Sequence, residues 1–249
     1  MSASNKKPLA LIGENPNEYI KQGLLENGFE VISLPCDLRL APQVTSHADM
    51  LIFHLDNTVF CNKIYYENNR SVFDLIKEYG YNINLSEFTV ASEYPNDIAL
   101  NQAIIGKNII GRIDSCANSI LEHSKSLGYS YKNTKQGYAK CSTLVLNENA
   151  IISADKNIIS IAKTIDIDTL LIENGINQII LDGYNYGFIG GASTVYKNNV
   201  YFFGNLMLHN QYNEINEFCK KHGFSTVSLG KEMLCDIGGA IILPYIYEN

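Results

Sequence analysis

Short hydrophobic runs alternate with amphipathic stretches along the whole chain, in an order that repeats five times. Each repeat opens with a hydrophobic run and passes through a polar loop into a stretch whose apolar residues recur at helical spacing. A second hydrophobic run follows, and a glycine- or acid-marked loop leads into a third. The opening runs are 9–13, 59–62, 108–111, 151–155 and 201–205. They lie roughly 45–50 residues apart, a period that indicates a repeated supersecondary unit.

The helix in each repeat is predicted from its apolar stripe and from the residue that ends it. In the first repeat, apolar residues recur at helical spacing over 19–25, and Gly28 can adopt the left-handed conformation that ends a helix. Gly80, Gly128 and Gly223 take the same place in three other repeats. The fourth repeat predicts a helix over 158–165 and has Asp-Ile-Asp at 166–168 instead of glycine. The second has a long lead-in, 64–70, before a helix over 71–79.

Five loops precede the third runs, and they are where we expect a functional site. They are 46–50, 94–98, 137–142, 187–192 and 235–240. The last two end alike, in Ile-Gly-Gly-Ala, and paired glycines before a strand indicate close backbone approach. A closed ring of repeats would place all five loops around one axis. An open α/β sheet is the alternative, but such a sheet alternates strand and helix, whereas here two strand-like runs follow each helix.

Composition narrows the class of protein and of partner. The 249 residues are 46% hydrophobic and 18% charged, as in an ordinary globular protein. The net charge of −7 argues against nucleic acid as a partner and favours a small, cationic ligand. The alternative is that the negative charge serves only solubility. No apolar stretch approaches the roughly 20 residues of a membrane span, and no export signal is evident, so a cytoplasmic location is expected. The six cysteines form no Cys-x-x-Cys pair and are expected to be reduced thiols.

The expected organisation is one domain over 8–249, with residues 1–7 flexible. The repeats are predicted at about 8–57, 58–107, 108–149, 150–199 and 200–249. No cofactor is expected, because the glycines of 187–191 lack the spacing of a dinucleotide-binding loop. Oligomeric state is left open.

Three runs carry a resemblance to a known fold family. They are Gln-Gly-Tyr-Ala-Lys-Cys-Ser at 136–142, Asn-Tyr-Gly-Phe-Ile-Gly-Gly-Ala at 185–192 and Asp-Ile-Gly at 236–238. With the five repeats, they resemble the pentein, or guanidino-group-modifying-enzyme, fold, and more closely an uncharacterised bacterial family of that fold. Arginine and agmatine deiminases, amidinotransferases and dimethylarginine hydrolases share the fold, as does a non-catalytic ribosome anti-association factor. The resemblance implies an α/β-propeller of five ββαβ-type repeats around a pseudo-fivefold axis.

One departure from that family bears on function. Catalytic penteins end in Gly-Gly-x-x-His-Cys, where the cysteine attacks the guanidino carbon. The matching run here is 238–243, and it places Ile242 and Leu243 at the histidine and cysteine positions. Neither side chain can carry a proton or act as a nucleophile. Either the chemistry has moved to another repeat, or this is a non-catalytic pentein that binds a small cation or a protein partner.

Cys141 is the best replacement nucleophile, for a cysteine-dependent hydrolase or transferase of guanidino or amidine C–N bonds. Attack needs a thiolate, and Lys140 could lower the thiol pKa. Adjacent strand residues face opposite ways, however, and a buried structural cysteine is the alternative. His47 is the candidate proton carrier, two residues from Asp49; a turn or capping role is equally open.

The remaining candidates lie in other loops. His209 is a second candidate proton carrier. The candidate substrate-binding residues are Asp49, Asp97, Lys140, Asp155, Asn185 and Asp236. Carboxylates that converge from several loops would bind a guanidinium or ammonium group through charge-assisted hydrogen bonds. Asp155 opens a helix, so capping is its alternative role. A metal site from His47, Asp49 and His209 has no supporting ligand spacing, and none is predicted.

Overall fold

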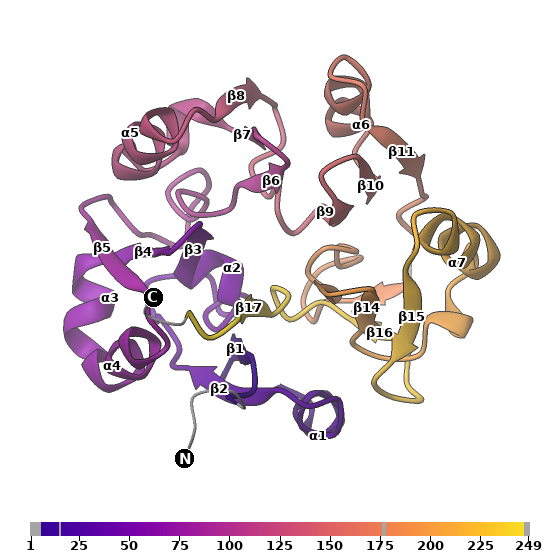
Figure 1. The fold of residues 1–249 in the computed structure, drawn as a ribbon, viewed down its shortest axis with the longest axis horizontal. Coiled ribbons are helices and arrows are strands. Elements are labelled where there is room, and N and C mark those ends of the chain that lie inside the picture. Colours follow the sequence, from indigo (N-terminus) through magenta and orange to yellow (C-terminus); the bar gives the residue numbers. More distant parts are fainter. Residues whose placement is uncertain (1–5, 15, 176–177, 247–249) are drawn as a thin grey trace.

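Five three-stranded sheets stand around a central axis, with their helices at the outer edge of the ring (Figure 1). The computed structural model describes residues 6–14, 16–175 and 178–246. Most of the segment predicted as flexible, residues 1–5, therefore lies outside the described residues. We call each three-stranded sheet with its helix a blade. The middle strand of each blade pairs with one neighbour in antiparallel orientation and with the other in parallel orientation. The connection between the two parallel strands contains the helix of the blade.

The blades follow one another along the chain. The second comprises β3 (Ile52–Leu55), β4 (Thr58–Asn62), α3 (Lys63–Asn68), α4 (Arg70–Glu78) and β5 (Asn82–Ser86). The third comprises β6 (Ala103–Ile105), β7 (Asn108–Gly111), the 3-10 helix η2 (Ile113–Ser115), α5 (Asn118–Ser126) and β8 (Ser130–Asn133). The fourth comprises β9 (Thr143–Asn147), β10 (Ala150–Ser153), α6 (Lys156–Lys163) and β11 (Asp168–Leu171). The fifth comprises β13 (Ser193–Tyr196), β14 (Asn199–Phe202), the 3-10 helix η3 (Leu206–Leu208), α7 (Tyr212–Lys221) and β15 (Ser225–Ser228).

The first blade joins the two ends of the ring. It contains β1 (Leu9–Gly13), α1 (Glu18–Glu26) and β2 (Glu30–Leu34), and its antiparallel partner strand is β17 (Ile241–Leu243). β12 (Ile179–Ile180) and β16 (Leu234–Cys235) form a further two-stranded parallel sheet, and α2 (Ala48–Leu51) is a short helix before β3. The predicted ββαβ repeats around an axis are confirmed.

Three of the predicted repeat boundaries fall in the tight turns between antiparallel strands, and the boundary at 199/200 falls one residue inside β14. The third run of each predicted repeat therefore pairs with the opening strand of the next one, as β3 does with β4. The long lead-in at 64–70 is itself largely helical: most of it forms α3, whose first turn is capped by the Asn62 side chain. In the fourth repeat Asp166 adopts a φ of 58° and so takes the left-handed position that glycine holds elsewhere.

Hydrophobic clusters fill the spaces between consecutive blades. On β1, Leu9 and Leu11 pack toward the second blade, whereas Ala10 and Ile12 pack toward the fifth. Successive strand residues face opposite sides, and the middle strand of each sheet is buried almost entirely on both faces, which is why these strands read as nearly continuous hydrophobic runs. Within the described part of the chain, no helix is long and apolar enough to cross a membrane.

Candidate functional site

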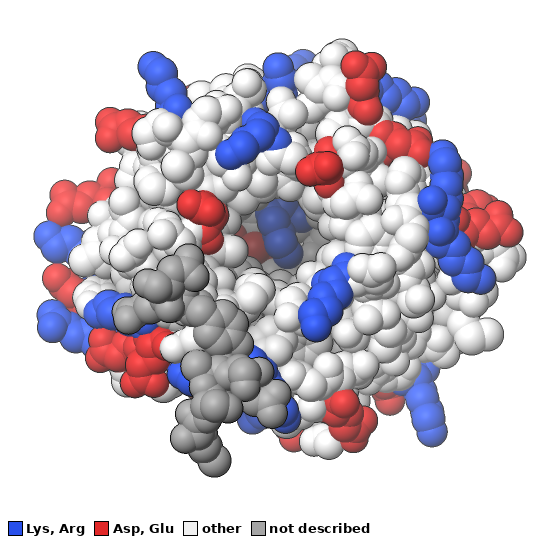
Figure 2. Space-filling model, viewed as in Figure 1, with Lys and Arg blue, Asp and Glu red and all other residues white. Residues whose placement is uncertain are grey.

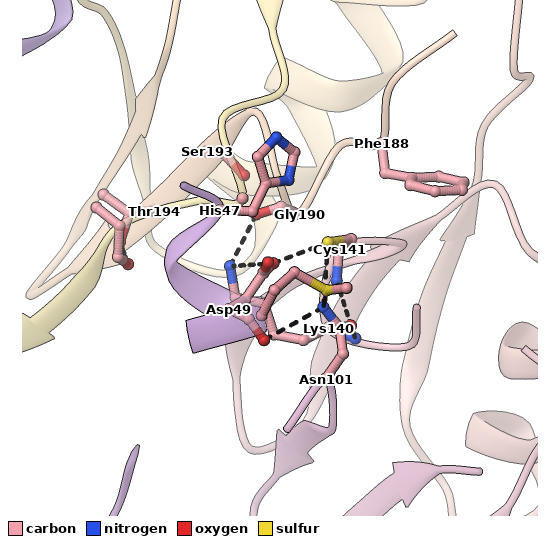
Figure 3. A network of polar contacts seen from close by, with 12 residues as sticks. His47, Asp49, Asn101, Lys140, Cys141, Phe188, Gly190, Ser193 and Thr194 are labelled. Carbon is pink, nitrogen blue, oxygen red and sulfur yellow. Dashed lines mark hydrogen bonds and ion pairs between the residues drawn. The ribbon is translucent and has the colours of Figure 1, made fainter. Parts of the chain in front are cut away.

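Two axial loops bring a thiol, a carboxylate and an imidazole together (Figure 3). His47 precedes α2, Asp49 lies in α2, and Cys141 lies in the turn before β9. All three side chains are buried, and one ligand-type atom from each lies within 4.8 Å of the others. The Sγ of Cys141 donates a hydrogen bond of 2.9 Å to Oδ2 of Asp49. Residues 92 positions apart in the sequence are thus in direct contact.

Lys140 and Cys141 both reach Asp49, although neighbouring strand residues would face opposite ways. The Nζ of Lys140 lies 3.6 Å from Oδ2 of Asp49 and donates a 3.0 Å hydrogen bond to the carbonyl of Gly190. Residues 139–142 form a turn rather than a strand, so strand alternation does not apply. Asn101 holds this turn: its Oδ1 accepts from the backbone N–H groups of Lys140 (2.9 Å) and Cys141 (3.2 Å).

Sequence reasoning missed Asn101. Its Nδ2 also donates a 3.2 Å hydrogen bond to Sγ of Cys141, and its side chain is fully buried. The residue stands just before β6, at the end of an axial loop, but a lone asparagine in a loop gives no signal that it will orient a cysteine 40 residues away.

The paired glycines allow the loops to meet at the axis, as predicted from their sequence. A Cβ atom at Gly190 would overlap the backbone carbonyl oxygen of Lys140, and one at Gly238 would overlap Cα of His47. Gly238 and Gly239 also have φ values of 75° and 73°, which side chains rarely adopt. Glycine is therefore required here both for space and for backbone conformation.

Asp236 places a second buried carboxylate beside the first. Its Oδ2 accepts from the backbone N–H of Phe188 (2.8 Å) and its Oδ1 from that of Gly238 (3.0 Å). Oδ1 also lies 3.8 Å from Nδ1 of His47. The two hydrogen bonds fix the loop at 187–192 against the loop at 235–240, and the carboxylate lies near the imidazole.

Burial and the two carboxylates work against ionisation of the thiol. Burial first, and then the charges of Asp49 and Asp236, raise the pKa of Cys141 well above its usual range, and the opposing effect of Lys140 is smaller. Burial likewise raises the pKa of Asp49, although Lys140 and His47 partly offset it. Lys140 lowers the thiol pKa, as expected, but burial and the carboxylates from other loops outweigh one lysine, so the net shift of the Cys141 pKa is upward.

A cavity of about 250 Å³ opens beside the thiol. His47, Cys141 and Asp236 line its base, and Asn185, which is exposed, lies on its rim. Its walls are aromatic: they include Tyr138, Tyr184, Tyr186 and Phe188. The rings of Tyr138 and Phe188 stack with centroids 6.3 Å apart, and Tyr186 meets Phe188 edge-on at 5.9 Å. The cavity thus combines acidic groups with flat aromatic faces.

Asp97 does not line this cavity but contacts its wall. Its Oδ2 accepts a 2.6 Å hydrogen bond from the hydroxyl of Tyr138. Burial raises the pKa of Asp97, partly offset by that hydrogen bond. The carboxylate therefore positions an aromatic side chain of the cavity rather than facing a ligand.

His209 lies away from the Cys141 cavity. It follows η3, and its Nδ1 accepts a 3.1 Å hydrogen bond from the backbone N–H of Gln211. It is buried, and burial lowers its pKa. The structure thus brings His47 to the candidate nucleophile and leaves His209 in the fifth blade.

Asp155 caps a helix. Its Oδ1 accepts from the backbone N–H groups of Asn157 (2.8 Å) and Ile158 (2.9 Å), at the start of α6, and its Oδ2 accepts from Gln136. We expect Asp155→Ala to lower the free energy of unfolding by about 1 kcal/mol. Thermal unfolding measures this, and the alkylation rate of Cys141 should stay unchanged. Reduced reactivity at Cys141 with unchanged stability would contradict the capping role.

The same cluster includes the groups that could hold a metal ion. Nitrogen, carboxylate and thiolate ligands are those that zinc prefers, and His47, Asp49 and Cys141 supply one of each. The possible metal site considered from the sequence comprised His47, Asp49 and His209. In the structure Cys141, rather than His209, completes the group of possible ligands with His47 and Asp49. Asp49 Oδ1 has no hydrogen-bond partner among the described residues, so it is free to act as a ligand.

Comparisons with known proteins place the chain in a family and a fold. The profile of a family described as "Family of unknown function (DUF6873)" matches residues 11–241. No curated protein matches the sequence. Among solved structures, a mutant dimethylarginine dimethylaminohydrolase from Pseudomonas aeruginosa, complexed with citrulline, has a TM-score of 0.55 at 11% identity, covering 94% of this chain and 96% of that one.

Two further solved structures are similar over nearly their whole length. The agmatine deiminase of C. jejuni has a TM-score of 0.56 at 9% identity, covering 100% of this chain and 96% of that one. The inosamine-phosphate amidinotransferase of Streptomyces griseus has a TM-score of 0.57 at 10% identity, covering 98% and 95%. At such identities the likeness shows the fold, and the predicted pentein fold is confirmed.

Proposed function

Because the chain belongs to DUF6873, a family of unknown function, we propose its activity from its own side chains: a cysteine-dependent hydrolase or transferase that cleaves a C–N bond of a guanidino or amidine group. One observation carries the proposal. The thiol of Cys141 lines a cavity with aromatic walls, donates a hydrogen bond to the carboxylate of Asp49 and lies close to the imidazole of His47. A nucleophile, a proton acceptor and a proton carrier are the groups that such a reaction needs.

The cavity is suited to a flat cation. Asp49 and Asp236 are buried carboxylates beside the thiol, and their charges attract a guanidinium or amidinium group. The faces of Tyr138, Tyr186 and Phe188 add a favourable interaction with a cation that lies over them. Such a ligand also offsets the two negative charges that raise the thiol pKa. The thiolate would therefore form mainly when the substrate is bound.

The proposed first half-reaction forms a covalent intermediate on sulfur. Asp49 accepts the proton of Cys141 as Sγ bonds to the central carbon of the substrate, and an electron pair of that carbon moves onto nitrogen. Protonated His47 gives its proton to the departing nitrogen, the C–N bond breaks, and ammonia or an amine leaves. The remaining amidinium carbon stays bonded to Sγ.

The second half-reaction releases the amidinium group from the sulfur of Cys141. A water molecule adds to the carbon and gives one proton to His47, after which the C–S bond breaks and the sulfur takes back the proton from Asp49. The remaining hydroxyl proton of the ureido or amide product passes to the released ammonia or to solvent. In a transferase, an amine takes the place of water.

The solved structures that share this fold support the proposed chemistry through the reactions that their names describe. A dimethylaminohydrolase, a deiminase and an amidinotransferase all modify guanidino or amidino groups. Their catalytic cysteine is not carried over to this chain, because the equivalent position is Leu243, which is fully buried in the core. The proposal therefore rests on Cys141, which comes from a different blade.

A pair of matched alkylating reagents tests the proposal. 2-Chloroacetamidine carries an amidinium cation, and 2-chloroacetamide is its neutral counterpart. We expect Cys141 to prefer the cationic reagent at pH 7 by about tenfold or more relative to the preference of Cys36, a partly exposed cysteine outside the cavity. Peptide mass spectrometry after timed quenching gives both rates in the same sample.

Turnover is tested in parallel with arginine, agmatine and simple amidines, by measuring ammonia release. A cation preference with ammonia release supports the enzyme. The same preference without release from any compound would favour the non-catalytic cation-binding alternative. Equal or slower labelling of Cys141 by the cationic reagent would contradict both.

A further inference from the structure

A second cavity of about 330 Å³ lies on the ring axis, lined by the inner strands β3, β6, β9, β13 and β17. The space-filling view shows a hollow at the centre of the ring, with basic and acidic atoms at its base (Figure 2). Among the residues that the structure describes, this cavity and the one beside Cys141 have no lining residue in common. Thr194, which lines the first, and Phe188, which lines the second, lie on opposite sides of the Asp49–Lys140 pair (Figure 3).

Strand register makes the walls of this axial cavity apolar. Each inner strand pairs with the middle strand of its blade. The inner-strand residue that pairs with the second residue of the middle strand is partly buried and lines the cavity. In order around the ring these residues are His54, Ile104, Val145, Val195 and Ile242. Four of the five are aliphatic and β-branched, so they form a stiff hydrocarbon ring. Only the second blade breaks the pattern, with a histidine whose Nε2 contacts the carbonyl of Asp56 at 2.6 Å.

The base of the axial cavity carries one positive and one negative group. The Lys140 side chain is 27% exposed, and its distance of 3.6 Å from Asp49 is longer than a hydrogen bond, so Nζ retains donor capacity. Oδ1 of Asp49 and Oγ1 of Thr143 are buried and have no hydrogen-bond partner among the described residues. A buried polar group without a partner is unfavourable, and a ligand that satisfies it gains affinity.

We propose that the axial cavity binds a small zwitterion, an α-amino acid with an aliphatic side chain. Lys140 turns from Asp49 toward the ligand's carboxylate, and the ligand's ammonium group replaces it at Asp49. The hydrocarbon chain then packs against the ring that includes Val195 and Ile104. A simple anion would be repelled by Asp49 and a simple cation by Lys140, so the two charges together favour a ligand that carries both.

The inference goes beyond the proposed function and does not depend on it. It concerns a different cavity, and it holds whether or not Cys141 attacks a guanidino carbon. The two sites nevertheless share one carboxylate. Oδ2 of Asp49 accepts the Cys141 hydrogen bond, and Oδ1, which has no partner in the described part of the chain, would accept from the ligand's ammonium group.

Three probes with the same hydrocarbon tail test the ligand class: leucine, 4-methylpentanoate and 3-methylbutylamine. Isothermal titration calorimetry with the full chain should show saturable binding of leucine, and binding at least tenfold weaker for the two compounds with a single charge. No binding of leucine at millimolar concentration would overturn the proposal, as would equal binding of all three.

Two variants locate the site. Val195→Trp fills the hydrocarbon ring and is expected to abolish leucine binding, while alkylation of Cys141 shows that the opposite cavity is intact. Thr143→Val removes one unpartnered hydroxyl at the base without adding bulk, and should weaken leucine binding severalfold; it is the decisive variant if Val195→Trp does not fold. Leucine binding that survives Thr143→Val unchanged but is lost in Phe188→Ala would place the ligand beside Cys141 and overturn the proposal.

Discussion

Cys141→Ser is expected to lower turnover of guanidino compounds by about a thousandfold or more, because a serine hydroxyl at this position lacks the acidity and nucleophilicity of a thiol. The thiol is held by Asp49 and Asn101 at distances of 2.9 and 3.2 Å, and serine is close to it in size. The fold should therefore survive, and the melting temperature should change by no more than a few degrees. Ammonia release under substrate saturation is the measurement.

The matched control is Cys36→Ser, in a partly exposed thiol that does not line the cavity of Cys141. It should retain full turnover. Intact protein mass should also show a trapped adduct of substrate or amidine reagent on the wild type and on the control, and none on Cys141→Ser. Turnover that persists in Cys141→Ser would place the reaction elsewhere.

Asp49→Asn is expected to stabilise the protein at pH 7 while it removes reactivity at Cys141. The carboxylate of Asp49 is fully buried and its pKa is raised, so its ionised form costs free energy in the fold. Asparagine removes the charge at nearly the same volume. Lys140 is not stranded, since it is partly exposed and keeps its hydrogen bond to Gly190. We expect a gain on the order of 1 kcal/mol, or about 2–4 °C in melting temperature.

The pH dependence of this gain follows from the direction of the pKa shift. A carboxyl group whose pKa is higher in the folded than in the unfolded chain destabilises the fold wherever both states are ionised. That cost disappears as pH falls below the unfolded value of about 3.9, because both states are then protonated. The advantage of Asp49→Asn over the wild type should therefore be largest at neutral pH and shrink toward pH 4.

Asp74→Asn is the control for this comparison. Asp74 pairs with Lys77 on the exposed surface of α4, at 3.0 Å, and its loss should change stability by less than about 0.5 kcal/mol at any of these pH values. A lower stability of Asp49→Asn than of the wild type at pH 7 would show that the Lys140 pair outweighs the cost of burying the charge.

The ring itself was predictable because its signals are local and repeated. Hydrophobic runs, helical stripes and the left-handed glycines at Gly28, Gly80, Gly128 and Gly223 recur at one spacing, and all four adopt positive φ. Strands that are buried on both faces give unbroken apolar runs, so their positions in the sequence could be predicted accurately. Long-range pairing was not visible in the same way: that β17 completes the first blade, and that β12 pairs with β16, depends on contacts across the chain.

The sequence predicted which residues form the candidate site better than it predicted their pKa shifts. His47, Asp49, Lys140, Cys141 and Asp236 were all named from the sequence, and they meet. The direction of the thiol pKa shift could not be obtained, because it depends on how deeply the thiol is buried and on which charges face it from other loops.

Residues whose role depends on a distant partner were harder still. Asp97 contacts the hydroxyl of Tyr138, 41 positions away, and Asn101 orients Cys141, 40 positions away. Neither separation leaves a trace in local sequence pattern. Asp155 shows the opposite case: a helix start gives a local signal, and the capping alternative describes the observed contacts.

Closure of the ring by β17 imposes an order on biosynthesis. The first blade needs a strand that is translated more than 200 residues after β1, as the pairing of Leu9 with Leu243 shows. A nascent chain can assemble its middle blades as they leave the ribosome, but β1 keeps an unpaired edge until residue 243 is free. Asp236 lines the cavity beside Cys141, and Ile241 and Ile242 of β17 line the axial cavity, so both cavities are complete only after synthesis has passed this point.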